Sequence, residues 1–555
     1  MAKKISPFKN ESYLDFNDET INAAQKAALE EVRSKLGVEY NMLIGGKRVK
    51  GKKGTFKREN PSNIKETVGI FQMASRKQAI KALDAAWEAF ETWKYVSPEI
   101  RADYLFRAAD VVRRRRLEFN AWAITEVGQN FAETDAQIAE AIDFLEYYGR
   151  EALRYADGMD VIDTQSERNK TIYIPIGAGI SISPWNFPFA ITIGMAAGPI
   201  AAGNTVVAKP SPDSPMMAQL VSEVFEEVGL PDGVFNLVTG DNIEVGESLV
   251  KSHKTRFINF TGSLGVGLRI TKLAGQPNDK QKFLKRVATE LGGKNAVVVD
   301  SEADLDAAAQ AIVTSAFGYQ GQKCSAGSRA IICEDVYDQV TERVIALTEE
   351  LEIGNAMHNY PVGPVVNKKA VDKILKYIDI GKKEGRLVVG GKKAKTDFKG
   401  YYIQPTVFID VPADARIAQE EIFGPVVALI KAKDFDDALK IANSTRFGLT
   451  GAFFSKNPSK IDRALREFHV GNLYINRKST GALVGAQPFG GFNLSGTDSK
   501  AGGRDYLLYF LQAKSLTERL QQGKKGPALC SGTSGPIQPT LTLSRYLISL
   551  TSGKQ

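Results

Sequence analysis

A thiol and a carboxylate stand in two short motifs near the middle of the chain. Glu290 opens a Glu-Leu-Gly-Gly-Lys segment, and Cys324 lies in a Gly-Gln-Lys-Cys-Ser-Ala segment. A thiolate can attack a carbonyl carbon, and a carboxylate can then activate the water that releases the acyl group. Upstream, Asn186 lies in a Pro-Trp-Asn-Phe-Pro segment, where its amide could donate a hydrogen bond to the developing oxyanion. The three residues predict acyl-enzyme catalysis.

Each motif also has an ordinary interpretation. A lone cysteine is more often a small buried apolar residue than a nucleophile. Glu-Leu-Gly-Gly-Lys could be a strand end and a turn, and asparagine beside proline is typical of turns. Together and in this order, however, the motifs resemble the aldehyde dehydrogenase superfamily over roughly residues 40–520. The resemblance implies that Cys324 forms a thiohemiacetal and then a thioester, which Glu290 hydrolyses by activating water.

Three more segments resemble nucleotide-binding motifs of that family. Lys209 ends a strand-like Val-Val-Ala-Lys-Pro-Ser run, residues 260–267 place glycines between a strand and a helix, and Glu421 lies in Glu-Glu-Ile-Phe-Gly-Pro. Glycines there let a pyrophosphate approach the helix N-terminus. Alone, these segments could be a surface lysine, a turn without the usual Gly-x-Gly-x-x-Gly pattern and a pair of acids before a strand. The resemblance implies NAD as cofactor, bound by Lys209, Ser211, Gly262, Ser263, Gly267, Glu421, Phe423 and Trp185.

The choice between NAD and NADP depends on the residues after Lys209. In related folds an acid near the ribose 2′-hydroxyl repels a 2′-phosphate and so favours NAD. Where many members of the family carry glutamate, this chain has Pro212, with Asp213 next. We therefore predict that NAD is preferred and that NADP is usable.

Two further segments, residues 126–133 and 488–503, resemble the 1-pyrroline-5-carboxylate dehydrogenase branch of the superfamily. Enzymes of this branch oxidise L-glutamate γ-semialdehyde to glutamate in proline catabolism. The resemblance implies a substrate pocket in which Ser325 and the backbone N–H groups of Gly481 and Ala482 bind the amino-acid head. Two phenylalanines would flank the methylenes and a glutamate would shape the pocket: Phe187, Phe489 and Glu133.

Other functions remain open. Four residues depart from the pattern expected of the bacterial members: Lys478, Ala486, Gln487 and Arg504. Another semialdehyde dehydrogenase for an anionic aldehyde is therefore the main alternative. A non-redox thiol hydrolase or acyltransferase would need a histidine beside the cysteine, and none of the three histidines lies in a supporting motif. A non-catalytic relative of the fold would need none of Cys324, Glu290 and Asn186, so the presence of all three argues against this class.

Hydrophobic periodicity predicts an α/β fold. Residues 76–157 show a helical repeat of apolar positions, and short apolar runs then alternate with helical segments. This alternation is typical of parallel sheets. The predicted strands of a first set are 180–183, 205–208, 234–238, 257–260 and 295–299, and a second set after Asp300 includes 329–333 and 425–430.

The expected architecture is two doubly wound parallel-sheet domains plus a small β arm for oligomerisation, the arm being implied by the resemblance. Residues 1–157 and 176–297 would form the NAD-binding domain, and residues 298–487 the catalytic domain. Residues 158–175 and 488–520 would form the arm and a substrate-anchor loop, with strand 169–174 pairing near 502–515 in a homodimer or higher homo-oligomer. The linker-like composition of residues 521–555 predicts a flexible tail.

Composition limits the remaining classes. The 555 residues suffice for two or three domains, and three cysteines and three histidines fit neither a disulfide framework nor a zinc site. We expect no metal and a reduced, cytoplasmic setting, since the N-terminus lacks a signal peptide and prolines and glycines interrupt the most apolar region, 182–208. The net charge of +8 and the arginine run 113–116 fit a solvated helix face better than nucleic-acid binding. The expected partner is a small-molecule substrate, without nucleic acid or membrane.

Overall fold

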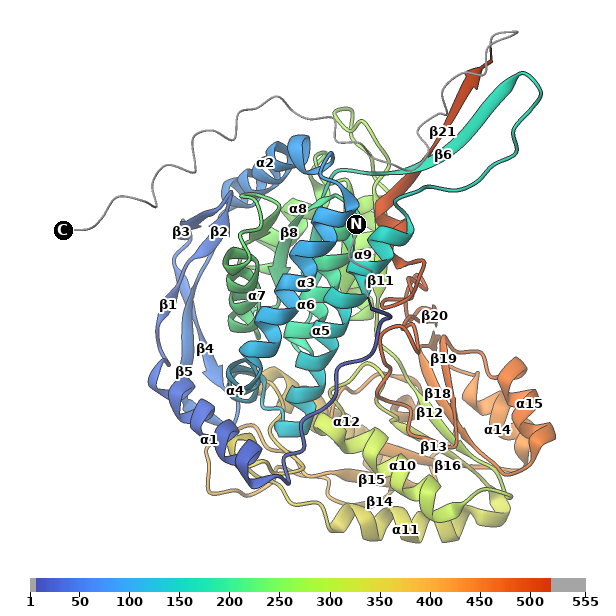
Figure 1. The fold of residues 1–555 in the computed structure, drawn as a ribbon. Helices are drawn as coiled ribbons and strands as arrows, with labels where there is room; N and C mark the ends of the chain where they lie inside the picture. The colour runs from blue at the N-terminus through green and yellow to red at the C-terminus, as the bar shows by residue number, and fades with distance from the viewer. Residues whose placement is uncertain (1–5, 521–555) are drawn as a thin grey trace.

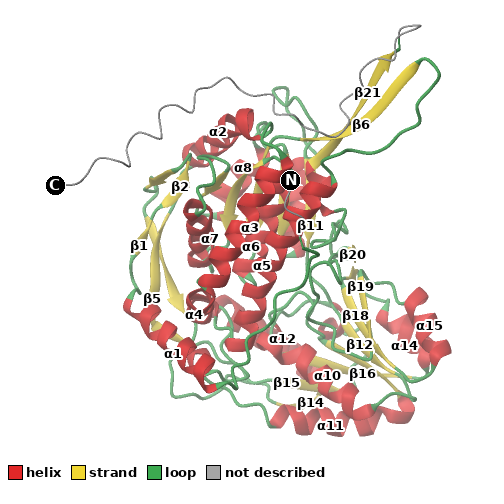
Figure 2. Ribbon diagram, viewed as in Figure 1, coloured by secondary structure: helices red, strands yellow, loops and turns green. Residues whose placement is uncertain are grey.

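The computed structural model describes residues 6–520. Two seven-stranded sheets with helical layers form the body, and a two-stranded ribbon projects from it (Figure 1, Figure 2). The helices of the described part include none that is both long and apolar enough to cross a membrane. The tail predicted over 521–555, and Cys530 within it, lie outside the described residues.

The first sheet has the strand order β11-β10-β7-β8-β9-β2-β3, and its strands from β11 to β9 are parallel. Alternate side chains of its strands face two different helical layers. Val207 contacts the core beneath α2, α8 and α9, whereas Val206 and Ala208 join the core beneath α3–α7. The strands are β2 (Met42–Ile44), β3 (Lys47–Val49), β7 (Ala178–Ser183), β8 (Thr205–Pro210), β9 (Phe235–Leu237), β10 (Phe257–Thr261) and β11 (Arg286–Glu290).

The order of the parallel strands creates a switch point between β7 and β10. From β7 the chain continues outward through β8 and β9, and it then returns to β10 and β11 on the other side. Crevices outside the carboxyl ends of strands at such a point are the usual ligand sites of open α/β sheets. The connecting helices are α6 (Pro188–Ala201), α7 (Pro215–Glu227), α8 (Ser248–Lys251) and α9 (Leu264–Ala274).

The second sheet has the order β14-β15-β16-β13-β12-β18-β19 and is parallel except for β14. Its strands are β12 (Ala296–Val299), β13 (Arg329–Cys333), β14 (Arg386–Val389), β15 (Thr406–Ile409), β16 (Val426–Ala432), β18 (Thr450–Phe454) and β19 (Asn472–Ile475). Its helices are α10 (Leu305–Phe317), α11 (Tyr337–Glu349), α12 (Lys368–Glu384), α13 (Arg416–Gln419), α14 (Phe435–Ala442) and α15 (Pro458–Glu467).

One predicted strand lies in the other sheet. Residues 295–299 were assigned to the first set, but β12 pairs with β13 and β18 in the second sheet. The first sheet is completed instead by β11, which the sequence prediction missed because only two of its five residues are buried. The crossing from one sheet to the other is short, since β11 ends at Glu290 and β12 starts at Ala296.

The predicted helical region 76–157 is confirmed as four helices: α2 (Arg76–Trp93), α3 (Pro98–Arg114), α4 (Arg116–Val127) and α5 (Phe131–Arg154). Local sequence explains their ends. Ser75 forms a capping box with Gln78, Pro98 occupies the first turn of α3, and Gly128 ends α4 in the left-handed region with a φ of 73°. α5 then runs beside α6 and lines the site described below.

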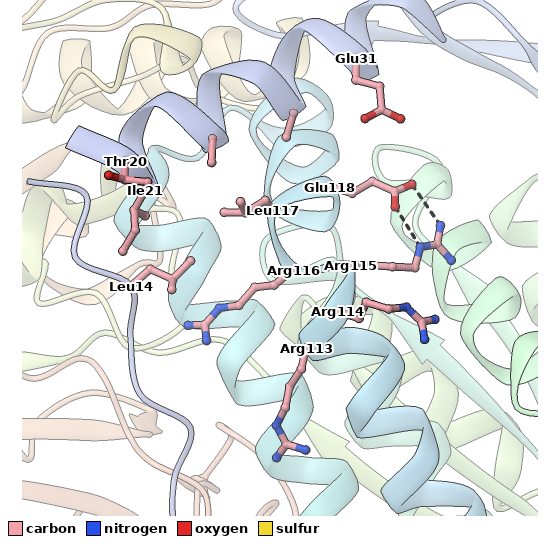
Figure 3. A pocket seen from close by; sticks show the side chains of 12 residues that line it. Leu14, Thr20, Ile21, Glu31, Arg113, Arg114, Arg115, Arg116, Leu117 and Glu118 are labelled. Atoms are coloured by element: carbon pink, nitrogen blue, oxygen red, sulfur yellow. Dashed lines mark hydrogen bonds and ion pairs between the residues drawn. The ribbon is translucent and has the colours of Figure 1, made fainter. Parts of the chain in front are cut away.

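The arginine run lies at a helix junction rather than on one helix face. Arg113 and Arg114 end α3, and Arg116 begins α4. Figure 3 shows Arg113 and Arg116 pointing away from each other and from Arg114 and Arg115, which lie side by side, around a cavity beside α1 (Glu19–Ser34). Each arginine is ion-paired: Arg113 with Glu11, Asp110 and Glu146, Arg114 with Glu227, Arg115 with Glu118, Glu223 and Glu227, and Arg116 with Asp135 and Glu11.

The projecting ribbon pairs β6 (Glu167–Pro175) with β21 (Leu511–Arg519) in antiparallel register (Figure 1). The second strand begins later than the 502–515 predicted. The preceding residues instead turn inward, because Phe489, Ala501 and Tyr506 line the central cavity. The remaining strands are β1 (Glu39–Tyr40), β4 (Thr55–Asn60) and β5 (Asn63–Gln72) in one small sheet, and β17 (Phe447–Gly448) with β20 (Phe492–Asn493) in another.

Candidate active site

A cavity of about 380 Å³ contains both Cys324 and Glu290. Its walls come from α5, α6, the end of β11, the turn that carries the cysteine, and two segments near residues 478–484 and 489–506. All six residues that the sequence suggested for substrate binding also line it: Ser325, Gly481, Ala482, Phe187, Phe489 and Glu133. The fold thus brings together residues that are up to several hundred positions apart in the chain.

The turn that carries Cys324 is held by side chains from behind. The Asn295 amide donates hydrogen bonds to the carbonyls of Cys324 (2.7 Å) and Ala326 (2.8 Å), and the Ser479 hydroxyl donates to the carbonyl of Ser325 (3.0 Å). Ser325 lies in this turn and not in a helix. Three backbone carbonyls of the turn are therefore hydrogen-bonded to side chains behind it, and these bonds fix the backbone around the thiol.

The thiol is held in its protonated form. Burial first, and then the charges of Glu290, Glu421 and Glu140, raise the pKa of Cys324 to about 12, against a lowering by the backbone N–H of Ser325. The thiolate is the nucleophilic form of cysteine. Attack on a carbonyl by this cysteine therefore requires a proton acceptor in the cavity.

Glu290 is an ionisable carboxyl in the same cavity. It ends β11, and burial raises the pKa of its carboxyl to about 8. Its Oε1 accepts a hydrogen bond from the Ser499 hydroxyl, while Oε2 is buried and has no hydrogen-bond partner among residues 6–520. A carboxyl with a pKa near neutral can exchange a proton with a thiol or a water at physiological pH.

Asn186 follows β7 at the switch point of the first sheet. The residue is 4% exposed, and its backbone carbonyl accepts a hydrogen bond from the Gln129 amide at 2.9 Å. Its own side-chain amide has no hydrogen-bond partner in the described part of the chain, and Asn186 is not among the residues that line the cavity of Cys324 and Glu290. The next residue, Phe187, packs edge-to-face on Tyr319 with ring centroids 5.9 Å apart.

Several residues suggested for the dinucleotide lie at the same switch point. Ser263 is the N-cap of α9, and the N–H of Gly262 donates to the carbonyl of Glu290 at 3.0 Å. A Cβ on Gly267 would lie 2.4 Å from a methyl of Leu291, so any other residue there would require the Leu291 side chain to shift. The N-terminus of α9 can accept an anionic group such as a pyrophosphate.

Lys209 lies at the end of β8 and is 1% exposed. Its ammonium donates to the side-chain oxygen of Asn242 and to the carbonyl of Pro210 at 3.2 Å. Burial lowers its pKa to about 8. The N–H of Ser211 donates to the carbonyl of Ser183 at 3.0 Å, which joins the ends of β8 and β7.

The remaining residues suggested for the dinucleotide are Trp185, Phe423 and Glu421. Trp185 packs edge-to-face on Phe423 with ring centroids 5.4 Å apart. The carboxylate of Glu421 accepts a hydrogen bond from the Gly293 N–H at 3.0 Å, and a Cβ on Gly292 would lie 2.4 Å from the same carboxylate. An ammonium, a helix N-terminus, two aromatic rings and a carboxylate are groups that suit the ribose, pyrophosphate and nicotinamide of a dinucleotide.

Several site residues could not be identified from the motifs. Lys323 forms an ion pair of 2.6 Å with Glu133, and Lys478 also lines the cavity. Ser499 contacts Glu290. Only Lys323 gave a usable signal, as a charged residue beside the proposed nucleophile. Additional cavity residues come from α5 and from the segment before α1: Glu140, Asp143, Tyr13 and Leu14.

Comparison with known proteins identifies the relatives of this chain. Residues 49–516 match the model of the "Aldehyde dehydrogenase family". The chain is 54% identical over 515 residues to a 1-pyrroline-5-carboxylate dehydrogenase of Geobacillus thermodenitrificans, covering 93% of this chain and 99% of the relative.

Solved structures give the same result. A mutant of Thermus thermophilus 1-pyrroline-5-carboxylate dehydrogenase superimposes with a TM-score of 0.92 at 50% identity, covering 93% of this chain and all of that one. The Thermus enzyme with bound NAD also has a TM-score of 0.92, at 49% identity and with the same coverage.

Proposed function

Because this chain belongs to the aldehyde dehydrogenase family, we propose that it oxidises L-glutamate γ-semialdehyde, the open form of 1-pyrroline-5-carboxylate, to L-glutamate. The observation that carries the proposal is the single cavity that holds Cys324, Glu290 and all six residues suggested for the substrate. The NAD-bound Thermus relative supports NAD as the cofactor, with Lys209, Ser263 and Glu421 among the residues that would hold it. Bound NAD supplies the acceptor for the hydride that leaves the substrate carbon.

The first half of the reaction forms a bond to sulfur. The thiol of Cys324 gives up its proton to water in the cavity, and the Sγ attacks the aldehyde carbon. The carbonyl oxygen becomes an oxyanion, which the free amide of Asn186 and the backbone N–H of Cys324 stabilise. Removing one oxyanion donor typically raises a barrier by about 3–4 kcal/mol. Loss of the aldehyde hydrogen with its electron pair leaves a thioester on Cys324.

The second half hydrolyses that thioester. Glu290 removes a proton from a water molecule, the resulting hydroxide attacks the acyl carbon, and the carbon–sulfur bond breaks. The sulfur leaves as a thiolate, and the product leaves as a carboxylate. Because the pKa of Glu290 is raised to about 8, this carboxyl can accept the proton of the attacking water and release it to solvent before the next cycle.

The substrate head would lie at the far side of the cavity from the reacting carbon. We assign its α-carboxylate to the Ser325 hydroxyl and to the backbone N–H groups of Gly481 and Ala482. Phe187 and Phe489 would flank the methylenes. Lys323 is already paired with Glu133 at 2.6 Å, so that ion pair shapes the wall.

A substrate panel tests the proposal. The full-length protein is mixed with NAD and one of three aldehydes: pyrroline carboxylate, succinate semialdehyde or uncharged propionaldehyde. We expect kcat/KM for pyrroline carboxylate to exceed the other two by at least about tenfold. Preference for succinate semialdehyde would favour the alternative anionic-aldehyde assignment, and acyl hydrolysis without NAD reduction would favour a thiol hydrolase.

The assembly and cell compartment are also proposals. The ribbon of β6 and β21 projects from the body (Figure 1), and we propose that it pairs with a second copy in a homodimer or larger homo-oligomer. A cytoplasmic location agrees with the reduced thiol that the mechanism needs. We keep the predicted division into a dinucleotide domain and a catalytic domain, with residues 295–299 moved to the latter. NADP would remain usable because the Asp213 carboxylate is engaged by Asn367 (2.9 Å) and Arg58 (3.6 Å).

A further inference from the structure

Ser499 contacts the proposed catalytic base but has no part in the mechanism above. It is 3% exposed, and its hydroxyl donates a hydrogen bond to Oε1 of Glu290. The other carboxylate oxygen is buried without a hydrogen-bond partner among residues 6–520. Ser499 therefore supplies the side-chain hydrogen bond that holds this carboxylate within the described structure.

The loop that carries Ser499 is fixed on the strand that carries Glu290. The N–H of Leu291 donates to the carbonyl of Ser495 at 2.7 Å, and the N–H of Thr497 donates to the carbonyl of Thr289 at 2.9 Å. The Thr289 N–H returns a hydrogen bond to the Thr497 hydroxyl at 2.9 Å. The spacing between base and hydroxyl is thus set by backbone pairing on both sides of Glu290.

The backbone around Ser499 is also strained. Asp498 and Lys500 flank it with φ values of 52° and 51°, in the left-handed region that non-glycine residues seldom adopt. The Lys500 ammonium donates to the carbonyls of Gly471 (2.7 Å) and Gly490 (3.1 Å), which holds this conformation. Strained residues persist where surrounding contacts over-determine them, and they concentrate at functional sites.

We propose that Ser499 is a positioning residue for the base: its hydroxyl orients Glu290 and stabilises the ionised carboxylate that deacylation requires. The inference rests on the proposed function, in which Glu290 activates water.

A hydrogen bond to the ionised form of a carboxyl lowers its pKa. At Glu290 burial raises the pKa, and the hydrogen bond from Ser499 and the charge of Lys500 lower it, while Asp498 raises it. Without the hydroxyl, Glu290 should be ionised only at higher pH. The titratable and charged groups that face Glu290 are Lys500, Asp498, Cys324, Tyr506 and Tyr509.

The test measures deacylation directly as a function of pH. The full-length enzyme and its S499A variant are mixed with saturating NAD and one equivalent of pyrroline carboxylate, quenched in acid, and weighed by intact mass spectrometry. For S499A we expect the acyl-enzyme to form within about threefold of the normal rate. The decay of the acyl-enzyme should slow by at least about tenfold at pH 7. In the plot of deacylation rate against pH, the rise on the acid side (the acid limb) should move up by about one to two pH units.

Matched variants separate this role from a structural one. Ser495→Ala removes a hydroxyl from the same loop that accepts a hydrogen bond from the Gly448 N–H. It keeps the bond between the Ser495 carbonyl and Leu291, and it should leave the acid limb in place. Ser499→Cys keeps a weak donor and should give an intermediate limb, which serves if S499A does not fold. In an E290Q background, S499A should slow deacylation no further.

An acid limb of S499A that coincides with that of the normal enzyme would overturn the inference. So would an equal shift in S495A, because the loop rather than the Ser499 hydroxyl would then be responsible. If the normal enzyme accumulates no acyl-enzyme at any pH while NAD is reduced, the proposed thioester function fails, and this inference fails with it.

Discussion

The ion pair between Lys323 and Glu133 makes a prediction that the structure quantifies. The two charges are 2.6 Å apart, and the side chains are 9% and 20% exposed. At an effective dielectric constant of about 20, their attraction is about 6 kcal/mol before desolvation. Desolvation cancels much of that gain. Removing the charge of Glu133 carries a further penalty at Lys478. Burial and the charge of Lys323 lower the pKa of Lys478, while the charge of Glu133 raises it.

Glu133→Gln should therefore destabilise the protein by about 2 kcal/mol, because it leaves Lys323 unpaired and facing a second lysine. Lys368 and Asp372 provide the control: their ion pair is also short, at 2.7 Å, but the side chains are 72% and 58% exposed. Asp372→Asn should cost about 0.5 kcal/mol or less.

The assay is thermal unfolding by calorimetry at fixed protein concentration, since assembly would make the midpoint depend on concentration. For E133Q we expect the midpoint to fall by about 2–5 °C, and for D372N by less than about 1 °C. The double variant K323M/E133Q should recover much of the loss, because no unpaired charge remains. Equal shifts in E133Q and D372N, or a double variant that is less stable than E133Q, would refute the reasoning.

Three further predictions concern the reaction. Cys324→Ala should abolish oxidation, while its affinity for NAD, measured by calorimetric titration, stays within about twofold. The control Cys333→Ala should remain active. Substantial turnover by Cys324→Ala would exclude a thioester. Glu290→Gln should retain a pre-steady-state burst of reduced cofactor but lose steady turnover, and equal loss of both phases would place Glu290 in thiol activation. Ser325→Ala should raise KM for pyrroline carboxylate by roughly ten- to a hundredfold but barely change that for propionaldehyde; equal effects would assign Ser325 to the nucleophile's geometry.

Much of the fold could be predicted because its signals are local. Helices α2 to α5 follow a repeat of apolar residues with recognisable caps, such as Ser75 before α2 and Gly128 after α4. The strands β7, β8 and β10 are short buried runs that end in the motifs quoted above. Residues of one motif keep their neighbours in any fold, so motif residues could be named without knowing the sheet order.

Contacts between distant segments could not be predicted. Nothing in the sequence around Ser499 indicates that it meets Glu290, because the contact depends on the register of a loop along β11. The sheet membership of β12 depends on the path of the five residues before it, not on its own apolar side chains. Asp213 could be placed beside the cofactor motif, but its ties to Asn367 and Arg58 could not.

The short crossing between the two sheets explains how these separate motifs act as one site. Glu290 ends β11 and supplies the base, and Leu291 fills the space beside Gly267 on α9. Gly293 donates to Glu421, and Asn295 holds the turn of Cys324. Base, suggested dinucleotide residues and nucleophile are therefore fixed by consecutive residues of one segment that is too short to move one without the others. This coupling is a physical reason for the glycines here, since a side chain at position 292 would displace the Glu421 carboxylate.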